Sequence, residues 1–166
     1  MWRRNGVKSM IEKALEQVKL KRKENLENLQ KEGLAILKLH EKLEKANIKH
    51  EFIDRKAERA KRTKEVEKLF IFDYQILIEE KGHQISLIQS PFSYGIMNNL
   101  IEIYNFNQEP ITLWYTDAFK FIKHKSLNDY ICYANKAFYA DAGEDPKQMR
   151  EELHKFIKII MESEDN

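Results

Sequence analysis

The tripeptide Glu79-Glu80-Lys81 is the stretch of this sequence that comes nearest to a catalytic motif. Its E-x-K form is found in metal-dependent nucleases, where an acidic pair holds Mg²⁺ and the lysine polarises the attacking water. Asp54 or Asp73 would have to supply the second carboxylate, and Asp73 precedes the tripeptide on the same expected strand. A chain rich in Glu and Lys also produces this spacing by chance, so the competing interpretation is a charged hairpin turn.

The histidines and the cysteine form no familiar metal or nucleophile motif. The five histidines are His40, His50, His83, His124 and His154. No two of them have the spacing of a helix-borne zinc site, and the glycine patterns that cradle nucleotides are missing from the sequence. Cys132 lies in an apolar helical pattern that predicts a buried, inert thiol. We therefore expect no catalytic residue, no metal site and no cofactor.

A basic segment over residues 54–68 is the first candidate binding site. Its cations are Arg55, Lys56, Arg59, Lys61, Arg62 and Lys64. In a helix, Arg55, Arg59 and Arg62 share one face, and such a row can follow the phosphates of a nucleic acid. The segment has almost nothing apolar to bury. It is either an arm that binds nucleic acid or a solvated helix with ion pairs four residues apart.

The turn SPFSYG, residues 90–95, is the second candidate binding site. Pro91 follows an expected strand, where its missing N–H costs no sheet bond, and Gly95 permits the positive φ of a reversing chain. Phe92 and Tyr94 cannot easily enter the same core if side chains alternate along the chain. We predict an exposed ring here, available to a partner protein or to a nucleic-acid base.

The elements that position these residues follow from hydrophobic periodicity. Apolar spacing predicts a helical region over 7–47 that lapses at 19–25, with either a break near Asn25 or one long helix. Alternation predicts strands over 69–79 and 84–90, joined by a hairpin at Lys81-Gly82. Two further strands are expected at 99–106 and 111–115, although the former also fits helical spacing.

Capping residues predict three helices at the end of the chain. Thr116 would cap a short helix, Ser126 with Asp129 resembles a capping box, and Asp145-Pro146 is a strong helix start. The fold class is therefore α+β. An antiparallel sheet of about four strands packs with C-terminal helices and is preceded by a long, coiled-coil-like helical arm. We place a basic helical arm at 1–68 and an α+β domain at 69–166.

Composition limits the setting in which the chain works. A single cysteine rules out an intramolecular disulfide and predicts an intracellular, cytoplasmic protein, and no apolar run is long enough to span a membrane. Residues 1–68 hold 20 Lys/Arg and 12 Asp/Glu, a net +8, whereas residues 69–166 hold 9 and 15, a net −6. This split indicates a surface for a charged partner, or neutralisation of one half by the other.

The block over residues 85–122 resembles small accessory proteins encoded by bacteriophages and prophages. The matching positions are Ile88, Ser93, Tyr94, Gly95, Leu100, Glu102, Ile103 and the stretch 114–121. The resemblance implies a non-enzymatic interaction protein in the cytoplasm of a bacterial host cell. The expected role is anti-CRISPR-like inhibition of a bacterial defence enzyme that handles nucleic acid. The expected partner is a host protein, either a nuclease or the complex of that nuclease with its nucleic acid.

Three alternatives stay open at the level of sequence. One is a nucleic-acid-binding accessory protein that contacts DNA or RNA through the basic arm. Another is a small metal-dependent nuclease that uses Glu79 and Lys81. The third, compatible with a binding role, is a homodimer that pairs the apolar stripe of the N-terminal helix with its own copy.

Overall fold

The computed structural model describes residues 2–59, 69–138 and 145–163 and divides the chain into two compact units, residues 1–33 and 34–166. The first unit is a single helix, α1, Trp2–Glu32. It runs without a break through residues 19–25, where the apolar stripe lapses. The helix ends at Glu32, and the next residue, Gly33, has a φ of 110°, which is accessible to glycine and costly for other residues.

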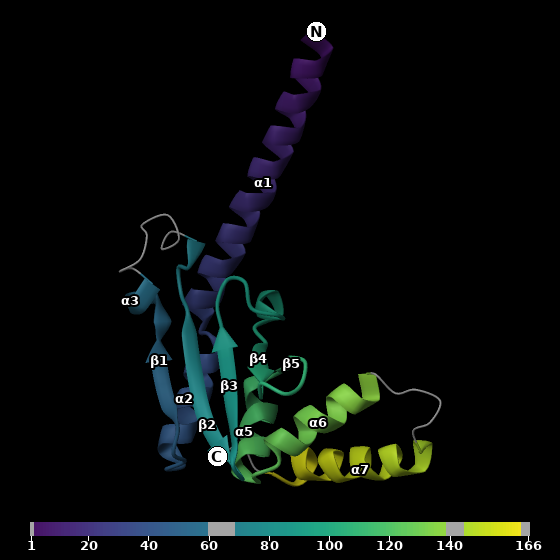
Figure 1. The fold of residues 1–166 in the computed structure, drawn as a ribbon. Coiled ribbons are helices and arrows are strands. Elements are labelled where there is room, and N and C mark those ends of the chain that lie inside the picture. Colours follow the sequence, from purple (N-terminus) through teal and green to yellow (C-terminus); the bar gives the residue numbers. More distant parts are fainter. Residues whose placement is uncertain (1, 60–68, 139–144, 164–166) are drawn as a thin grey trace. The chain divides into compact units, whose positions relative to one another are not determined.

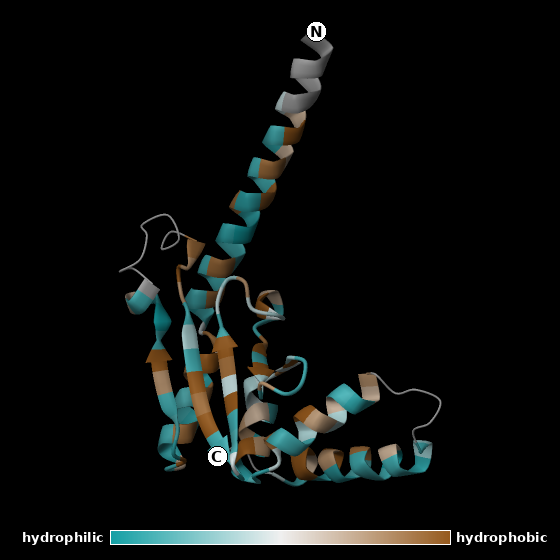
Figure 2. Cartoon of the chain, viewed as in Figure 1, coloured by the Kyte–Doolittle hydropathy of each residue, from teal (hydrophilic) through white to brown (hydrophobic). Residues whose placement is uncertain are grey.

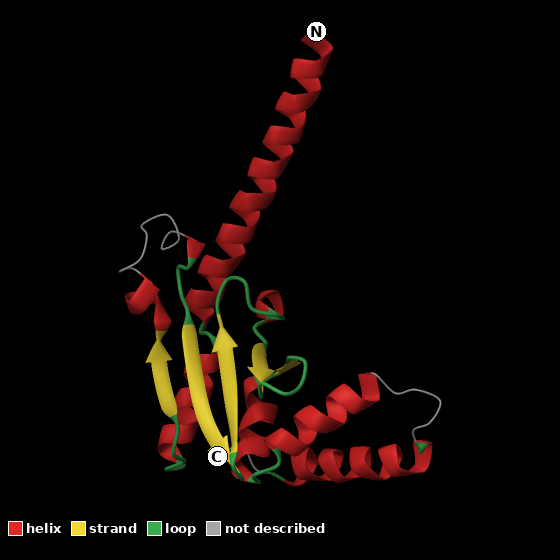
Figure 3. Cartoon of the chain, viewed as in Figure 1, coloured by secondary structure: helices red, strands yellow, loops and turns green. Residues whose placement is uncertain are grey.

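The second unit combines helices with one sheet (Figure 1). Its elements are α2 (Ala35–Lys45), β1 (Glu51–Asp54), α3 (Arg55–Arg59), β2 (Tyr74–Glu80), β3 (His83–Gln89), η1 (Ile96–Asn98), β4 (Ile101–Tyr104), β5 (Ile111–Leu113), α5 (Tyr115–Lys123), α6 (Leu127–Phe138) and α7 (Pro146–Glu162). The five strands form one antiparallel sheet in the order β1-β2-β3-β4-β5, drawn in yellow in Figure 3. The predicted α+β class is confirmed, with five strands where about four were expected.

The additional strand is β1, which pairs with β2 so that Phe52 lies opposite Ile76. α2 packs on the sheet, and β1 is one of its strands. The boundary between the two units therefore falls after Gly33, not after residue 68. The sequence signal for β1 is weak because the strand has only four residues and stands between polar segments. Its apolar side chains gain their partners only when β2 is beside them.

The β2–β3 hairpin has the predicted turn. Tyr74 lies opposite Gln89 at one end and Glu80 opposite His83 at the other. The two linking residues, Lys81 and Gly82, both have positive φ, which matches the right-handed twist of the flanking strands. Residues 101–104 are a strand and not a helix, because their side chains alternate between buried and half-buried.

The core lies between the sheet and two helices. α2 contacts β2 and β3, and α5 lies beside α2 behind the sheet in the view of Figure 1. Apolar stretches, brown in the ribbon of Figure 2, occur in both the strands and the helices of this unit. Fully buried residues come from each layer: Ile36, Leu39 and Leu43 of α2, Ile76 and Leu87 of the sheet, and Phe119 of α5. Each such side chain contributes about 1.5–3 kcal/mol to folding.

Two helices are capped by side chains from other elements, namely from strands of the sheet and from the loop before β4. The N–H groups of Ala35 and Ile36, at the start of α2, donate to Asn99 Oδ1 at 3.0 Å and Gln89 Oε1 at 2.9 Å. Gln89 is fully buried and also donates to Asn99 Oδ1 and to the carbonyl oxygen of Leu100, both at 3.0 Å. α2 thus needs no capping side chain of its own.

α6 is capped in the same manner, by the Glu80 carboxylate of β2, which accepts from the N–H groups of Leu127 and Asn128. The expected capping box is therefore wrong, since the Ser126 hydroxyl donates instead to the Phe121 carbonyl oxygen at 3.3 Å.

The other two predicted caps have different outcomes. α5 begins at Tyr115 after Trp114, so Thr116 lies inside the helix and does not cap it. The prediction for α7 is confirmed, because Asp145 Oδ1 accepts from the N–H of Lys147 at 3.0 Å.

Candidate functional sites

The structure does not assemble the predicted nuclease motif. Glu79 is exposed, and Lys81 Nζ lies 3.7 Å from Asp129 Oδ2 across the end of the sheet. Asp73 lies six residues before Glu79 on an extended chain, a separation of about 20 Å. Asp54 lies opposite Tyr74, the first residue of β2, whereas Glu79 is near the other end of that strand. Neither carboxylate can therefore share a metal ion with Glu79.

The basic segment falls partly within the described residues. Arg55 and Lys56 open α3 with half-buried side chains, and the N–H of Arg55 donates to the Asp73 carbonyl oxygen at 2.8 Å. Arg59 is the last residue of that helix. Lys61, Arg62 and Lys64 lie outside the described residues. The predicted row of arginines on one helical face thus stays a prediction.

The turn after β3 is held by a compact set of hydrogen bonds. The Ser90 N–H donates to Ser93 Oγ at 3.1 Å, and Ser93 Oγ donates to the Ser90 carbonyl oxygen at 2.9 Å. The Phe92 N–H donates to Ser90 Oγ at 3.2 Å. Pro91 and both serines are buried. We call residues 90–99 the aromatic turn.

Four residues at and after this turn explain how it is fixed. Gly95 has a φ of 75°, and a Cβ at this position would lie 2.8 Å from the Leu100 Cβ. The Tyr94 N–H donates to the Glu102 carboxylate of β4, and burial raises the pKa of that carboxyl more than this bond lowers it. Positions 94, 95, 100 and 102 of the block therefore hold the loop against the sheet.

The rings of the aromatic turn point outward. Phe92 is 55% exposed and Tyr94 is 64% exposed, and Met97 beside them is also exposed. The Phe70 ring lies with its centroid 5.1 Å from that of Phe92. The sequence predicted one exposed ring, and the structure exposes both because their backbone follows the turn and not a strand.

Cys132 does not occupy the buried position predicted for it. It is exposed on α6, beside a cavity of about 750 Å³ whose lining includes Tyr104 and Phe106. Partial desolvation, and then the negative charge of Asp129, raise the pKa of this thiol above its ordinary value. The thiol is therefore protonated at neutral pH and is a weak nucleophile.

A histidine cluster that the sequence analysis missed lies where α2 meets β1. The helix ends in a Schellman motif, in which Asn47 has a φ of 57° and its N–H donates to the Glu44 carbonyl oxygen. The Ile48 N–H donates to the Leu43 carbonyl oxygen at 3.0 Å. This turn sends the chain back along α2 and places His50 against the helix.

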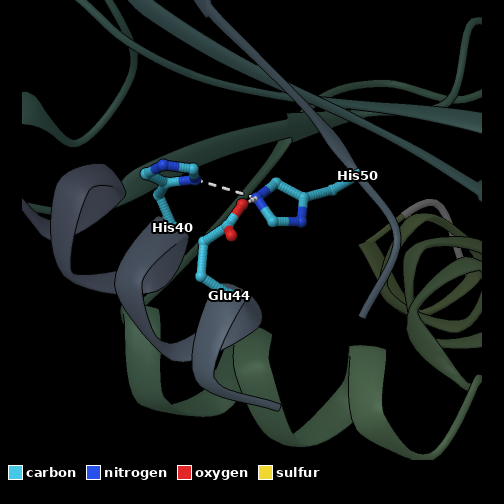
Figure 4. A group of neighbouring side chains, drawn as sticks. All are labelled: His40, Glu44 and His50. Carbon is cyan, nitrogen blue, oxygen red and sulfur yellow. Dashed lines mark hydrogen bonds and ion pairs between the residues drawn. The ribbon is translucent and has the colours of Figure 1, made fainter. Parts of the chain in front are cut away.

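Three side chains converge at this junction (Figure 4). His40 Nδ1 lies 2.8 Å from His50 Nε2, and Glu44 Oε1 lies 3.5 Å from the same His50 nitrogen. His50 Nδ1 bonds to the Ile48 carbonyl oxygen at 2.7 Å. The His40 ring stacks on Phe52 of β1 with a centroid separation of 4.1 Å.

The available sequence signal for this cluster was a histidine and a glutamate four residues apart on one helix. A search restricted to pairs of histidines does not find it, and His40 also fits the apolar stripe of that helix.

Comparison with known proteins places the chain in no family. No protein-family model matches the chain, and neither the curated proteins nor the solved structures give a match. Among the helices in the described part of the chain, none has the length and apolar character needed to cross a membrane.

Proposed function

We propose that this protein acts by binding another protein, without catalysing a reaction, and that the aromatic turn is its contact surface. One observation carries this proposal: two large rings, Phe92 and Tyr94, are exposed on a backbone that is fixed by hydrogen bonds and by Gly95.

The physical argument concerns the cost of association. Aromatic side chains supply most of the binding energy at many protein interfaces, where they fill pockets of the partner. A loop that is already ordered loses little conformational entropy when it binds, so more of the contact energy appears as affinity. The partner best suited to this surface is a protein with an apolar pocket that accepts both rings.

The more specific form of the proposal is inhibition of a bacterial nucleic-acid-handling defence enzyme, in the manner of an anti-CRISPR protein, in the host cytoplasm. Its support is the resemblance of residues 85–122 to phage accessory proteins, together with the opposite net charges of the two parts of the sequence. The aromatic turn falls within that block.

The test compares the wild type, a Phe92→Ala/Tyr94→Ala double variant and a Phe138→Ala control. Phe138 is an exposed ring on α6, outside the turn. Each tagged chain is used to capture proteins from bacterial cells, and the captured protein is purified and titrated against all three chains. We expect the double variant to bind at least about 30-fold more weakly, the equivalent of one interface hot spot, and the control to bind normally.

Equal capture by the double variant, or no specific protein captured by the wild type, would contradict the proposal. Binding of single-stranded DNA or RNA that depends on the two rings would assign the turn to base stacking instead. The specific form is tested by plating phage on cells that carry a CRISPR nuclease. Expression of the wild type should raise plating efficiency, and expression of the double variant should not.

A further inference from the structure

We propose that His40, Glu44 and His50 form a binding site for a divalent transition-metal ion of the class that includes Zn²⁺. Two imidazoles and one carboxylate are the ligand types that such ions prefer, and their three donor atoms lie within 4.8 Å of one another. The site lies away from the aromatic turn in sequence and does not depend on the proposed binding function.

The ligands are held by the fold and not by a flexible loop. His40 and Glu44 are four residues apart on α2 and so project from the same face of the helix. Leu39 and Leu43 of that helix are fully buried, which fixes its orientation against the sheet. The His50 side chain is only 2% exposed. Binding would therefore require little ordering of the protein.

The hydrogen bonds place an unshared electron pair where an ion would lie. The Ile48 carbonyl oxygen can only accept, so His50 Nδ1 carries the hydrogen of their 2.7 Å bond. Such a bond from the outer nitrogen to a carbonyl is the usual support of a metal-binding histidine. In the neutral ring, His50 Nε2 is then the atom that presents its electron pair to His40 and Glu44.

Because His50 Nε2 holds an electron pair, the hydrogen between it and His40 Nδ1 belongs to His40, which donates across this gap. Two nitrogens bound to a tetrahedral zinc ion lie about 3.3 Å apart, given Zn–N distances near 2.0–2.1 Å. The observed separation is 2.8 Å. An ion in place of that hydrogen therefore needs the two nitrogens to lie about 0.5 Å farther apart and the rings to turn so that both electron pairs point at it.

Three protein ligands leave a coordination position for water. Structural zinc sites usually have four protein ligands, whereas sites with three keep one position open. The Glu44 side chain is 64% exposed, so the open position faces solvent on the side from which an ion would enter. The shell is too poor in oxygen ligands for Ca²⁺ or Mg²⁺.

Titration calorimetry of the full-length chain with Zn²⁺ tests the site directly. We expect one ion per chain for the wild type and no saturable binding of Mg²⁺. Glu44→Gln should weaken Zn²⁺ binding by at least about tenfold, a loss that outer-shell changes alone can cause. Glu41→Gln is the matched control, since Glu41 is an exposed carboxylate on the same helix that pairs with Lys45.

Co²⁺ provides a second readout, because its visible absorption reports coordination by nitrogen and oxygen. The His50→Gln variant should lose this spectrum, with circular dichroism used to confirm that it folds. A variant in which the three exposed histidines, His83, His124 and His154, are all replaced by Gln should keep both the spectrum and the Zn²⁺ affinity.

The proposal is overturned if the wild type binds no Zn²⁺ in either measurement. It is also overturned if Glu44→Gln binds as tightly as Glu41→Gln, or if replacing the three exposed histidines abolishes binding. Because Glu44 is exposed, Glu44→Gln should fold even if replacement of His50 prevents folding.

Discussion

The Glu80 carboxylate, at the end of β2, accepts a 2.7 Å hydrogen bond from the backbone N–H of Asn128, 48 residues later in the chain. Its other oxygen accepts from the N–H of Leu127 at 3.1 Å. One buried acidic side chain therefore satisfies two of the free donors at the start of α6 and ties that helix to the sheet.

Replacing Glu80 should measurably destabilise the protein. Glu80→Ala leaves two buried N–H groups of α6 without acceptors, and we expect a loss of about 1–3 kcal/mol in the free energy of unfolding. Urea denaturation measures this loss. The neighbouring Glu79 is exposed, so Glu79→Ala should change stability by less than about 0.5 kcal/mol. Equal effects of the two variants would contradict the capping role.

Stability should also depend on pH through Glu80. Burial raises the pKa of its carboxyl above the ordinary 4.5, and this outweighs the lowering by the two hydrogen bonds. The folded state therefore holds this proton more tightly than the unfolded state, so the contribution is fully present below pH 4.5. This contribution to the stability of the folded protein is lost as the pH rises through the raised pKa of Glu80.

The pH effect of Glu80 is isolated by comparison with Glu80→Gln, which cannot titrate. From pH 4.5 upward, the stability of the wild type should fall relative to that of the variant until the carboxyl is fully ionised. Urea denaturation at a series of pH values gives both curves. A difference between the two curves that does not change with pH would show that the carboxyl has an ordinary pKa in the folded protein.

Gly95→Ala should destabilise the aromatic turn more than an equivalent change at another glycine. The new Cβ meets the Leu100 Cβ at 2.8 Å on a backbone with a φ of 75°. Gly82 has a similar φ of 82° but has no neighbouring atom within 4 Å, so its replacement adds strain without a clash. We expect Gly82→Ala to lower the free energy of unfolding by about 1–2 kcal/mol and Gly95→Ala to lower it by a further 1–3 kcal/mol, for about the same strain plus the clash. Thermal unfolding measures both losses.

Gln89 should be among the most sensitive polar residues of the sheet. It is fully buried and bonds to the N–H of Ile36, to Asn99 Oδ1 and to the Leu100 carbonyl oxygen. Gln89→Ala should cost about 3 kcal/mol or more, since several buried groups lose their partner together. Gln84→Ala, at an exposed position of the same strand, is the control. Similar stabilities of these two variants would show that the network is dispensable.

The sequence predicted the structure best where interactions between near neighbours in the chain determine the local conformation. The Lys81-Gly82 turn, the alternation of Ile101 and Ile103, and the capping of α7 by Asp145 depend on residues one to three positions apart. Thr116 and Ser126 have the same local signal as Asp145, yet they do not cap their helices. α5 begins one residue before Thr116, and at α6 Glu80 takes the role expected of Ser126.

The candidate sites divide in the same way. Phe92 and Tyr94 could be singled out from the sequence because a turn with Pro91 and Gly95 cannot bury every ring. The cluster that unites His50 with α2 could not be found by the same search, since it depends on how the chain turns at Asn47.

By itself, then, the sequence determined the class of fold, the β2–β3 hairpin and a turn at residues 90–95 with at least one exposed ring. These follow from periodicity and from residues that prefer particular backbone angles. Only the tertiary structure decided that Glu80, Gln89 and Asn99 cap distant helices and that His40, Glu44 and His50 meet. Such contacts join residues up to 64 positions apart. Their partners are chosen by the packing of α2 and α6 with the sheet, which no local pattern encodes.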